Sequence, residues 1–224
     1  MSKESIKNNY ESVMNKIRAL DPSGRTRVLF ATKTQGVDDI NYLISLGAEL
    51  IGENRVNELV EKFDGYDKSA ELHFIGTLQK NKVKYIYDKV SLIHSLDSRS
   101  LAEEINKRCG KIGKVMDVLV EVNSGREEAK GGILPEDVAD FIASLSDLEF
   151  IRVRGLMTMA PKCTSREEYL KYFTLTRELF DKLFKDKSDA ILSMGMSESY
   201  TYAIEAGATM VRIGSAIFGE RKYY

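Results

Sequence analysis

The sequence predicts a (β/α)₈ barrel with an extra N-terminal helix, as a single domain over residues 1–224. Eight short apolar runs alternate with segments of helical periodicity, and eight such units in about 200 residues match the small end of this fold. The runs are continuous, as in parallel strands that are covered on both faces. A doubly wound open sheet is the main alternative, but it usually has about five or six strands, and no G-x-G-x-x-G motif follows the first run.

The elements can be assigned in order from the apolar pattern. A helix is expected from about Ser5 to Leu20, because Ile6, Tyr10, Val13, Ile17 and Leu20 recur at helical spacing before the break at 21–24. The eight predicted strands lie at 28–31, 50–51, 73–75, 92–94, 115–122, 150–156, 190–192 and 210–213. The helical segments that follow them lie at 37–44, 56–63, 83–86, 101–105, 138–145, 169–183 and 200–204, with a short terminal helix after the last strand.

Composition excludes several classes of protein. Of the 224 residues 43% are hydrophobic, and a folded chain of this size buries enough surface to be stable without disulfides or bound metals. Thirty-three basic and 34 acidic residues give a net charge of −1, so we expect no binding to nucleic acid or to a membrane surface. Cys109 and Cys163 form no C-x-x-C pair, which favours a reducing compartment over disulfides or structural zinc. Without an apolar leader or a run of about 18 apolar residues, we expect a cytoplasmic, monomeric protein with no metal.

The end of the first predicted strand carries Lys33. In a barrel of this kind the chemistry lies at the carboxyl ends of the strands, where the loops converge. An ammonium group loses hydration there, which favours the neutral amine that Schiff-base chemistry needs. The alternative is a lysine that reaches the barrel mouth with no chemical role.

Two turns, after the seventh and eighth strands, are suited to binding an anion. They are Ser193–Ser197 and Ile213–Ser215, and each leads into a helix. Small residues allow the backbone to approach a ligand, and free N–H groups at helix starts favour phosphate. These two loops also form the usual phosphate site of the fold. Ser197 and Ser215 could alternatively be plain helix N-caps.

Arg212 adds a third element, because it lies within the eighth strand and an inward-pointing arginine needs an acceptor. A purely structural pair with an acidic side chain is the alternative. Lys33, a phosphate-binding loop and a buried donor in one barrel together indicate pyridoxal 5′-phosphate (PLP) as the cofactor. By contrast, we expect His73 and His94 to be core residues with satisfied hydrogen bonds rather than ligands.

Six blocks of sequence surround these residues. They are ATKT (31–34), GENRVNE (52–58), HFIGTLQKNK (73–82), GLMTMAP (155–161), LSMGMS (192–197) and GATMVRIGSAIFG (207–219). In this order, and from about Val28 to Glu220, they resemble the blocks of the pyridoxal phosphate homeostasis proteins. The resemblance implies a PLP-binding barrel of the alanine racemase class (fold type III) without the second domain of that class. Only 11 residues (224 minus 213) follow the eighth strand, which agrees with that expectation.

The resemblance also implies a set of cofactor-binding residues and no catalytic ones. Lys33 would form the covalent Schiff base, and Arg212 would face the pyridine nitrogen, where it disfavours protonation and makes the ring a poorer electron sink. Three further positions match the phosphate site, and two lie in motifs near the cofactor. These five are Ser197, Gly214 and Ser215 for the phosphate, and Asn54 and Met194 nearby. One departure concerns Ser199, which stands where the family usually has an acid.

The function expected from the resemblance is to buffer or deliver PLP inside the cell, with PLP-dependent apo-enzymes as possible recipients and without robust turnover. The alternative is an enzyme, either a PLP-dependent amino-acid racemase or a Schiff-base aldolase. A weaker alternative is a scaffold that regulates a partner and uses the cofactor as a signal.

Overall fold

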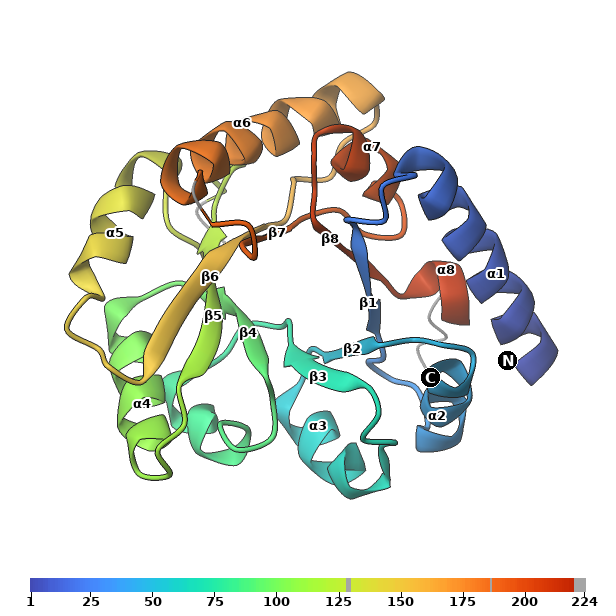
Figure 1. Cartoon of the computed structure of the whole chain (residues 1–224), viewed down its shortest axis with the longest axis horizontal. Helices are drawn as coiled ribbons and strands as arrows, with labels where there is room; N and C mark the ends of the chain where they lie inside the picture. The colour runs from blue at the N-terminus through green and yellow to red at the C-terminus, as the bar shows by residue number, and fades with distance from the viewer. Residues whose placement is uncertain (128–129, 186, 220–224) are drawn as a thin grey trace.

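Eight parallel strands close into a barrel in the order of the sequence, β1 to β8, and the closing pair is β8 with β1 (Figure 1). The computed structural model describes residues 1–127, 130–185 and 187–219. The remaining positions of the predicted domain, 128–129, 186 and 220–224, lie outside the described residues. Helices surround the strands on the outside, so the predicted (β/α)₈ barrel is confirmed.

The strands agree with the predicted apolar runs to within a few residues. They are β1 (Arg27–Ala31), β2 (Leu50–Glu53), β3 (Glu71–Phe74), β4 (Leu92–Leu96), β5 (Met116–Val122), β6 (Ile151–Thr158), β7 (Ile191–Ser193) and β8 (Met210–Ile213). The α-helices are α1 (Lys3–Leu20), α2 (Val37–Ser45), α3 (Val56–Lys62), α4 (Arg99–Gly110), α5 (Val138–Ser144), α6 (Arg166–Phe184), α7 (Tyr200–Glu205) and α8 (Ser215–Phe218). Three short 3₁₀ helices are η1 (Phe63–Gly65), η2 (Lys80–Tyr85) and η3 (Pro135–Asp137).

The connection after β3 differs from the α-helical expectation, because it forms the 3₁₀ helix η2. Val83 and Ile86 are both fully buried and are three residues apart. Residues at this spacing lie on one face of a helix with about three residues per turn, so a 3₁₀ turn buries both. Since only these two apolar side chains of the segment need burial, a longer α-helix would bury little additional apolar surface.

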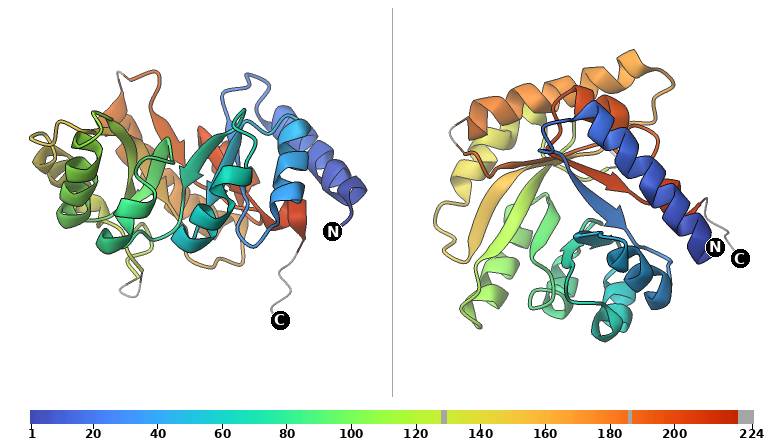
Figure 2. Two further views of the ribbon diagram at one scale, coloured as in Figure 1. Left: turned by 90° about the horizontal axis from the view of Figure 1, so that it is seen from below. Right: turned by 45° about the vertical axis from the view of Figure 1, so that its right-hand side comes forward.

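The extra N-terminal helix α1 packs beside α8 and α7 (Figures 1 and 2). Its first turn is capped by Ser2, whose hydroxyl accepts from the Ser5 N–H. Its predicted apolar stripe is buried at Ile6, Tyr10, Val13 and Ile17, whereas Leu20 at the last turn is exposed. The Asn9 side chain donates to the carbonyl of Ile217 at 2.9 Å. This helix therefore supports α8 from outside, and α8 begins at the loop that was predicted to bind phosphate.

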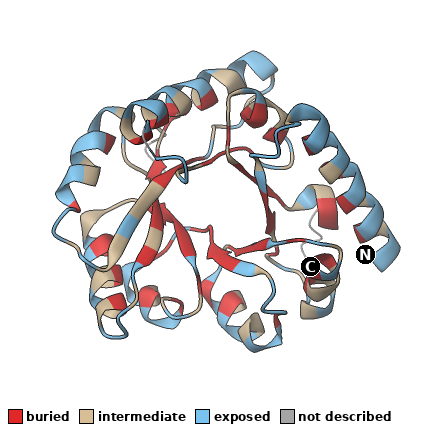
Figure 3. Ribbon diagram, viewed as in Figure 1, coloured by how far each residue is buried: buried red, intermediate tan, exposed pale blue. Residues whose placement is uncertain are grey.

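The core has two layers. Buried strand and helix residues form the outer layer, between the barrel and its helices (Figure 3). The inner layer is smaller and fills the barrel with two apolar clusters: Leu29, Leu50, Ile75 and Met210 in one, and Leu92, Leu119 and Met157 in the other. Buried polar side chains also occur on the described strands, and they are Glu53, His73, His94, Ser95, Glu121, Thr158, Ser193 and Arg212. Across the described ranges, no helix has the length and apolar character needed to cross a membrane.

Candidate functional site

A pocket of about 320 Å³ lies at the carboxyl ends of the strands, within the size range of small-molecule sites. The loops after β1, β2, β7 and β8 contribute most of its polar lining. Six of the seven predicted binding residues line it: Lys33, Asn54, Ser197, Arg212, Gly214 and Ser215. A smaller cavity of about 220 Å³ adjoins it and shares Tyr169, Met196 and Arg212.

Lys33 lies in the turn after β1 and is half-buried. Both of its neighbours are held by carboxylates: the Thr32 hydroxyl donates to Glu53 at 2.8 Å, and the Thr34 N–H donates to Glu58 at 2.7 Å. Thr34 adopts a φ of +66°, a conformation that costs energy for a β-branched residue. The two carboxylates therefore fix the turn that presents the lysine to the pocket.

Glu53 is the centre of the buried network under this turn. Its carboxylate also accepts from Tyr66 at 2.8 Å and from Lys62 at 3.1 Å. Burial and the negative charge of Glu53 raise the pKa of Tyr66, so the phenol stays protonated and continues to donate. Burial would raise the pKa of Glu58, but the Thr34 N–H and Lys62 outweigh it and lower that pKa. Glu58 is therefore a charged acceptor at neutral pH.

The predicted phosphate loop contains two N–H donors that share one acceptor. The Ser197 hydroxyl oxygen accepts from the Gly214 N–H at 3.1 Å and from the Ala216 N–H at 3.2 Å. It occupies the position that one oxygen of a bound anion would take between these donors. Gly195 shapes the loop with a φ of +86°, and a Cβ there would lie 2.5 Å from the Cβ of Ala203. The loop therefore requires glycine at this position.

Ser199, the departure from the usual family pattern, is buried behind the same loop. Its hydroxyl accepts from the Met196 N–H at 3.2 Å, just before the start of α7. The serine thus holds the loop by a neutral hydrogen bond. The neighbouring Glu198 is exposed at the rim of the pocket.

Met194 does not line the pocket, in contrast to its prediction as a cofactor-binding residue. Its side chain is fully buried in the outer core layer. The reason is the alternation of strand residues: Ser193 faces the barrel interior, so its neighbour Met194 faces the helices. The methionine that lines the pocket is Met196, from the turn that follows.

Arg212 lies at the floor of the pocket and is 5% exposed. Its guanidinium donates to the carbonyl and the hydroxyl of Ser193 at 2.9 and 2.8 Å, and to the carbonyl of Thr158 at 3.0 Å. Burial lowers the pKa of Arg212 to about 10, so the group is a cation at neutral pH. The inward-pointing arginine is confirmed, and these acceptors are uncharged.

Glu121 is a buried carboxyl that the sequence interpretation missed. It is 6% exposed in β5, and burial, followed by the charge of Asp97, raises its pKa to about 7. The positive charge of Arg212 opposes this shift. The available signal was an acid near the carboxyl end of β5, a strand whose other residues apart from Asp117 are apolar. Tyr169 was also missed, because its helical spacing on α6 indicated only a core position.

Asn54 follows β2 and presents a buried oxygen, Oδ1, for which the described residues offer no hydrogen-bond partner. Its backbone is packed tightly against Gly76, where a Cβ would lie 2.0 Å from the Asn54 carbonyl oxygen. The side chain is therefore held at the pocket, and a ligand hydroxyl or N–H could satisfy its oxygen. In the described part of the chain, no three His, Cys, Asp or Glu side chains are grouped as a metal site would require.

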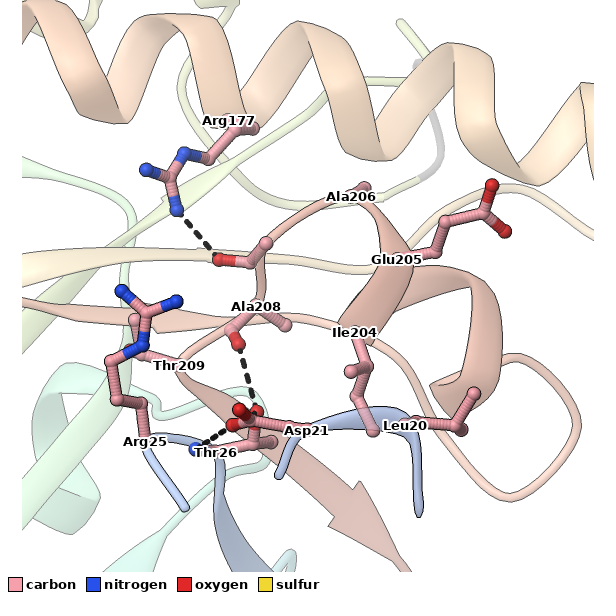
Figure 4. Close-up of a pocket in the computed structure, with 11 residues that line it drawn as sticks. Leu20, Asp21, Arg25, Thr26, Arg177, Ile204, Glu205, Ala206, Ala208 and Thr209 are labelled. Atoms are coloured by element: carbon pink, nitrogen blue, oxygen red, sulfur yellow. Dashed lines mark hydrogen bonds between the residues drawn. The ribbon is translucent and has the colours of Figure 1, made fainter. Parts of the chain in front are cut away.

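Another cavity, of about 380 Å³, lies at the opposite face, near the amino ends of β1 and β8 (Figure 4). Its polar groups connect the loops around it: Thr26 donates to Asp21 at 2.8 Å, and Arg177 donates to the Gly207 carbonyl at 2.8 Å. Hydrogen bonding lowers the pKa of Asp21 to about 2, with Ser23 as the main donor. These contacts tie α1, β1 and β8 together at the base of the barrel.

Comparison with known proteins first defines the class. The model of the alanine racemase N-terminal domain family matches residues 1–222. The alanine racemase of Clostridium difficile 630 has a similar fold, with a TM-score of 0.78 and 20% identity over 96% of this chain and 58% of that one. The chain is thus a barrel of the alanine racemase N-terminal domain class.

Two further relatives define the family more closely. The pyridoxal phosphate homeostasis protein of Aquifex aeolicus is 46% identical over 213 residues, which cover 92% of this chain and 93% of that protein. The structure of PipY from Synechococcus elongatus PCC7942 with PLP bound has a TM-score of 0.81 and 28% identity, over 96% of this chain and 100% of that one. This chain belongs to the pyridoxal phosphate homeostasis protein family, as the resemblance predicts.

The raised pKa of Glu121 predicts a pH-dependent stability. The folded state binds a proton that the unfolded state releases between about pH 4.5 and 7, so the stabilisation from Glu121 is complete below this window and lost as the pH rises through it. In Glu121→Gln the titration is removed. Its free energy of unfolding should therefore rise relative to wild type by about 3 kcal/mol between pH 4.5 and 8.

Urea denaturation across this pH range measures the difference. Glu149→Gln, at an exposed position, serves as the surface control. A difference between Glu121→Gln and wild type that does not change with pH would contradict the raised pKa.

Proposed function

We propose that this protein binds PLP in the pocket at the carboxyl ends of the strands, and that it buffers or delivers the cofactor without robust turnover. The observation that carries the proposal is the convergence of Lys33, the Ser197–Gly214 anion site and the buried Arg212 on one pocket of about 320 Å³. The family and the PLP-bound structure of the relative PipY support it.

The residues present fit this cofactor at three points. Lys33 supplies an amine, and the Ser197 hydroxyl with the N–H groups of Gly214 and Ala216 supplies hydrogen bonds for a phosphate. Asn54 supplies an oxygen that a hydroxyl or N–H of the ligand would satisfy. When bound, PLP supplies an electrophilic aldehyde on an electron-withdrawing ring.

Arg212 favours a carrier over a strong catalyst. In the proposed arrangement its guanidinium faces the pyridine nitrogen and, as a nearby cation, disfavours protonation there. The ring then withdraws fewer electrons than it would beside a carboxylate. Three hydrogen bonds hold the guanidinium in place, so this electrostatic environment is rigid.

We further propose that residues 1–224 form one PLP-binding domain, which acts as a monomer in the cytoplasm with PLP-dependent apo-enzymes as recipients. A racemase-like enzyme is the second candidate. It is favoured by Tyr169, which lines both the pocket and the adjoining cavity of about 220 Å³ and could act opposite Lys33.

The first test concerns Lys33. Borohydride reduction of the PLP-loaded protein, followed by peptide mass mapping, should place a pyridoxyl group on Lys33. Lys62 is the internal control, because its amine lies in the same region but is held 3.1 Å from Glu53. A group found mainly on Lys62 or another lysine would contradict the assignment.

The second test concerns the anion site. Ser197→Ala removes a hydroxyl whose charge-assisted hydrogen bond to phosphate is worth about 1.5–3 kcal/mol. The Kd for PLP should rise by about 10- to 100-fold, and that for pyridoxal, which lacks the phosphate, far less. Titration followed by absorbance measures both. Equal losses for the two ligands would mean that Ser197 supports only the loop.

The third test separates carrier from enzyme. Assays of the PLP-loaded protein with amino acids in both configurations should detect at most traces of α-proton exchange. Efficient acid–base catalysis needs a positioned group on each face of the reacting carbon, and each contributes about 10²–10⁴-fold. Robust turnover that is lost in both Lys33→Ala and Tyr169→Phe would overturn the carrier proposal in favour of a racemase.

A further inference from the structure

A row of buried polar side chains connects the pocket floor with the opposite face of the barrel. Arg212 donates to the Ser193 hydroxyl at 2.8 Å, and that hydroxyl lies 3.1 Å from Nδ1 of His94. Nε2 of His94 lies 3.1 Å from Nδ1 of His73. Nε2 of His73 lies 3.5 Å from a carboxylate oxygen of Glu71, at the start of β3. We call these five residues the Glu71–Arg212 chain.

The strand positions explain why the row exists. Glu71 and His73 are two residues apart on β3, so their side chains lie on the same face of the strand. His94 lies on the neighbouring strand β4, and Ser193 and Arg212 reach the interior from β7 and β8. All of these side chains point into the barrel. The row therefore crosses the interior, past the two apolar clusters that fill the rest of it.

The hydrogen positions along the row follow from its charged end. The His73 contact is the main cause that lowers the pKa of Glu71 to about 2, so its carboxylate can only accept. His73 must then carry its hydrogen on Nε2. Burial is the main cause that lowers the pKa of His73, so the ring is neutral and its Nδ1 is an acceptor.

The same reasoning continues along the row to the pocket. Since Nδ1 of His73 accepts, Nε2 of His94 donates. Burial, His73 and Arg212 lower the pKa of His94 well below its ordinary value, so this ring is also neutral and its Nδ1 accepts. The Ser193 hydroxyl then donates to His94 and accepts from Arg212. Each donor in the row points away from the pocket and toward Glu71.

Charged groups near the histidines are consistent with this assignment. Glu71 and Asp117 favour the charged form of His73, whereas Arg27 disfavours it, and burial outweighs all three. Arg27 lies 3.5 Å from Glu71, and both side chains are about half exposed. The row is therefore open to solvent at Glu71 and buried from His73 onward.

We propose that Glu71, His73, His94 and Ser193 are positioning residues that fix the Arg212 guanidinium at the pocket floor. The proposal rests on the proposed PLP-binding function. A rigid guanidinium needs an acceptor of fixed orientation, and Ser193 can offer its oxygen steadily only if its hydrogen is engaged elsewhere. His94 engages that hydrogen, and His73 and Glu71 hold His94 in the required tautomer. A substitution at the far end of the row should therefore change the orientation of the Arg212 guanidinium at the pocket and, with it, the affinity for the ligand.

The first experiment tests the tautomers in the protein itself. The chain has only two histidines, and both belong to the row. Nitrogen-15 NMR of histidine-labelled protein at pH 7 should therefore show two neutral rings, each with a hydrogen on Nε2 and none on Nδ1. A ring with its hydrogen on Nδ1, or a charged ring, would overturn the proposed direction of the row.

The second experiment tests the effect on the ligand. Ser193→Ala removes one of the three acceptors of Arg212, the hydroxyl that belongs to the row. It should raise the Kd for PLP about five- to tenfold and shift the absorbance of the lysine-bound cofactor. Ser95→Ala is the matched control: Ser95 is also a buried serine, but its hydroxyl has no hydrogen-bond partner among the described residues. Its Kd and spectrum should remain as in wild type.

A variant at the solvent-exposed end of the row tests whether Glu71 influences the pocket from a distance. Glu71→Ala should raise the Kd about two- to fivefold and give the His73 ring a mixture of tautomers, whereas Arg27→Ala, which removes only the outer partner of Glu71, should do neither. Both side chains are half exposed, so folding should be preserved.

The outcomes are distinguishable. Wild-type protein without saturable PLP binding would overturn the proposed function together with this proposal. If wild type binds PLP but Ser193→Ala and Glu71→Ala change only the melting temperature, the row is structural and this proposal alone fails.

Discussion

The buried positive charge of Arg212 is the constraint on which the rest of the site depends. A guanidinium that is 5% exposed has lost most of its hydration, and protein acceptors must replace the lost water. Three of them come from Ser193 and Thr158, at the ends of β7 and β6. The arginine itself belongs to β8, so its stability requires three neighbouring strands in register at this level. The register of β6, β7 and β8 thus sets the electrostatics of the pocket floor.

Arg212 and Lys33 are positioned in different ways. The acceptors at Arg212 are uncharged. Near Lys33 the acceptors are two carboxylates, those of Glu53 and Glu58. They bind Lys62 and the two residues on either side of Lys33. The carboxyl that faces Arg212 from within the barrel is Glu121, which is substantially protonated near neutral pH. Positive charge at the floor is therefore only partly compensated. In the proposed arrangement an anionic ligand would supply further negative charge nearby, where the Ser197 loop offers N–H groups.

Sequence patterns predicted the barrel because parallel strands covered on both faces leave continuous apolar runs. Lys33, Ser197 and Arg212 were predicted to lie together because the fold brings strand ends to one edge of the barrel, and they line one pocket. The remaining features depend on which way a side chain points and what it meets across the barrel. Met194 was predicted to face the cofactor, but it follows the inward-facing Ser193 and therefore points outward into the core. Ser193 contacts His94, which lies 99 residues away in the sequence. Periodicity contains no information about such neighbours, so these contacts required the three-dimensional structure.

The anion loop is built so that loading and unloading both leave its donors satisfied. The Ser197 hydroxyl oxygen accepts from Gly214 and Ala216, which are the N–H groups that a phosphate oxygen would engage. If a phosphate takes these donors, the hydroxyl is released to donate to the phosphate in turn. If the phosphate leaves, the hydroxyl oxygen returns, and no buried N–H pays the desolvation cost of an unmade bond. Ser197 would thus spare the empty loop two unmade hydrogen bonds, while its stronger charge-assisted bond to the phosphate would still favour the loaded loop. In the proposed function, such a site would hold its ligand and still allow its release to a recipient.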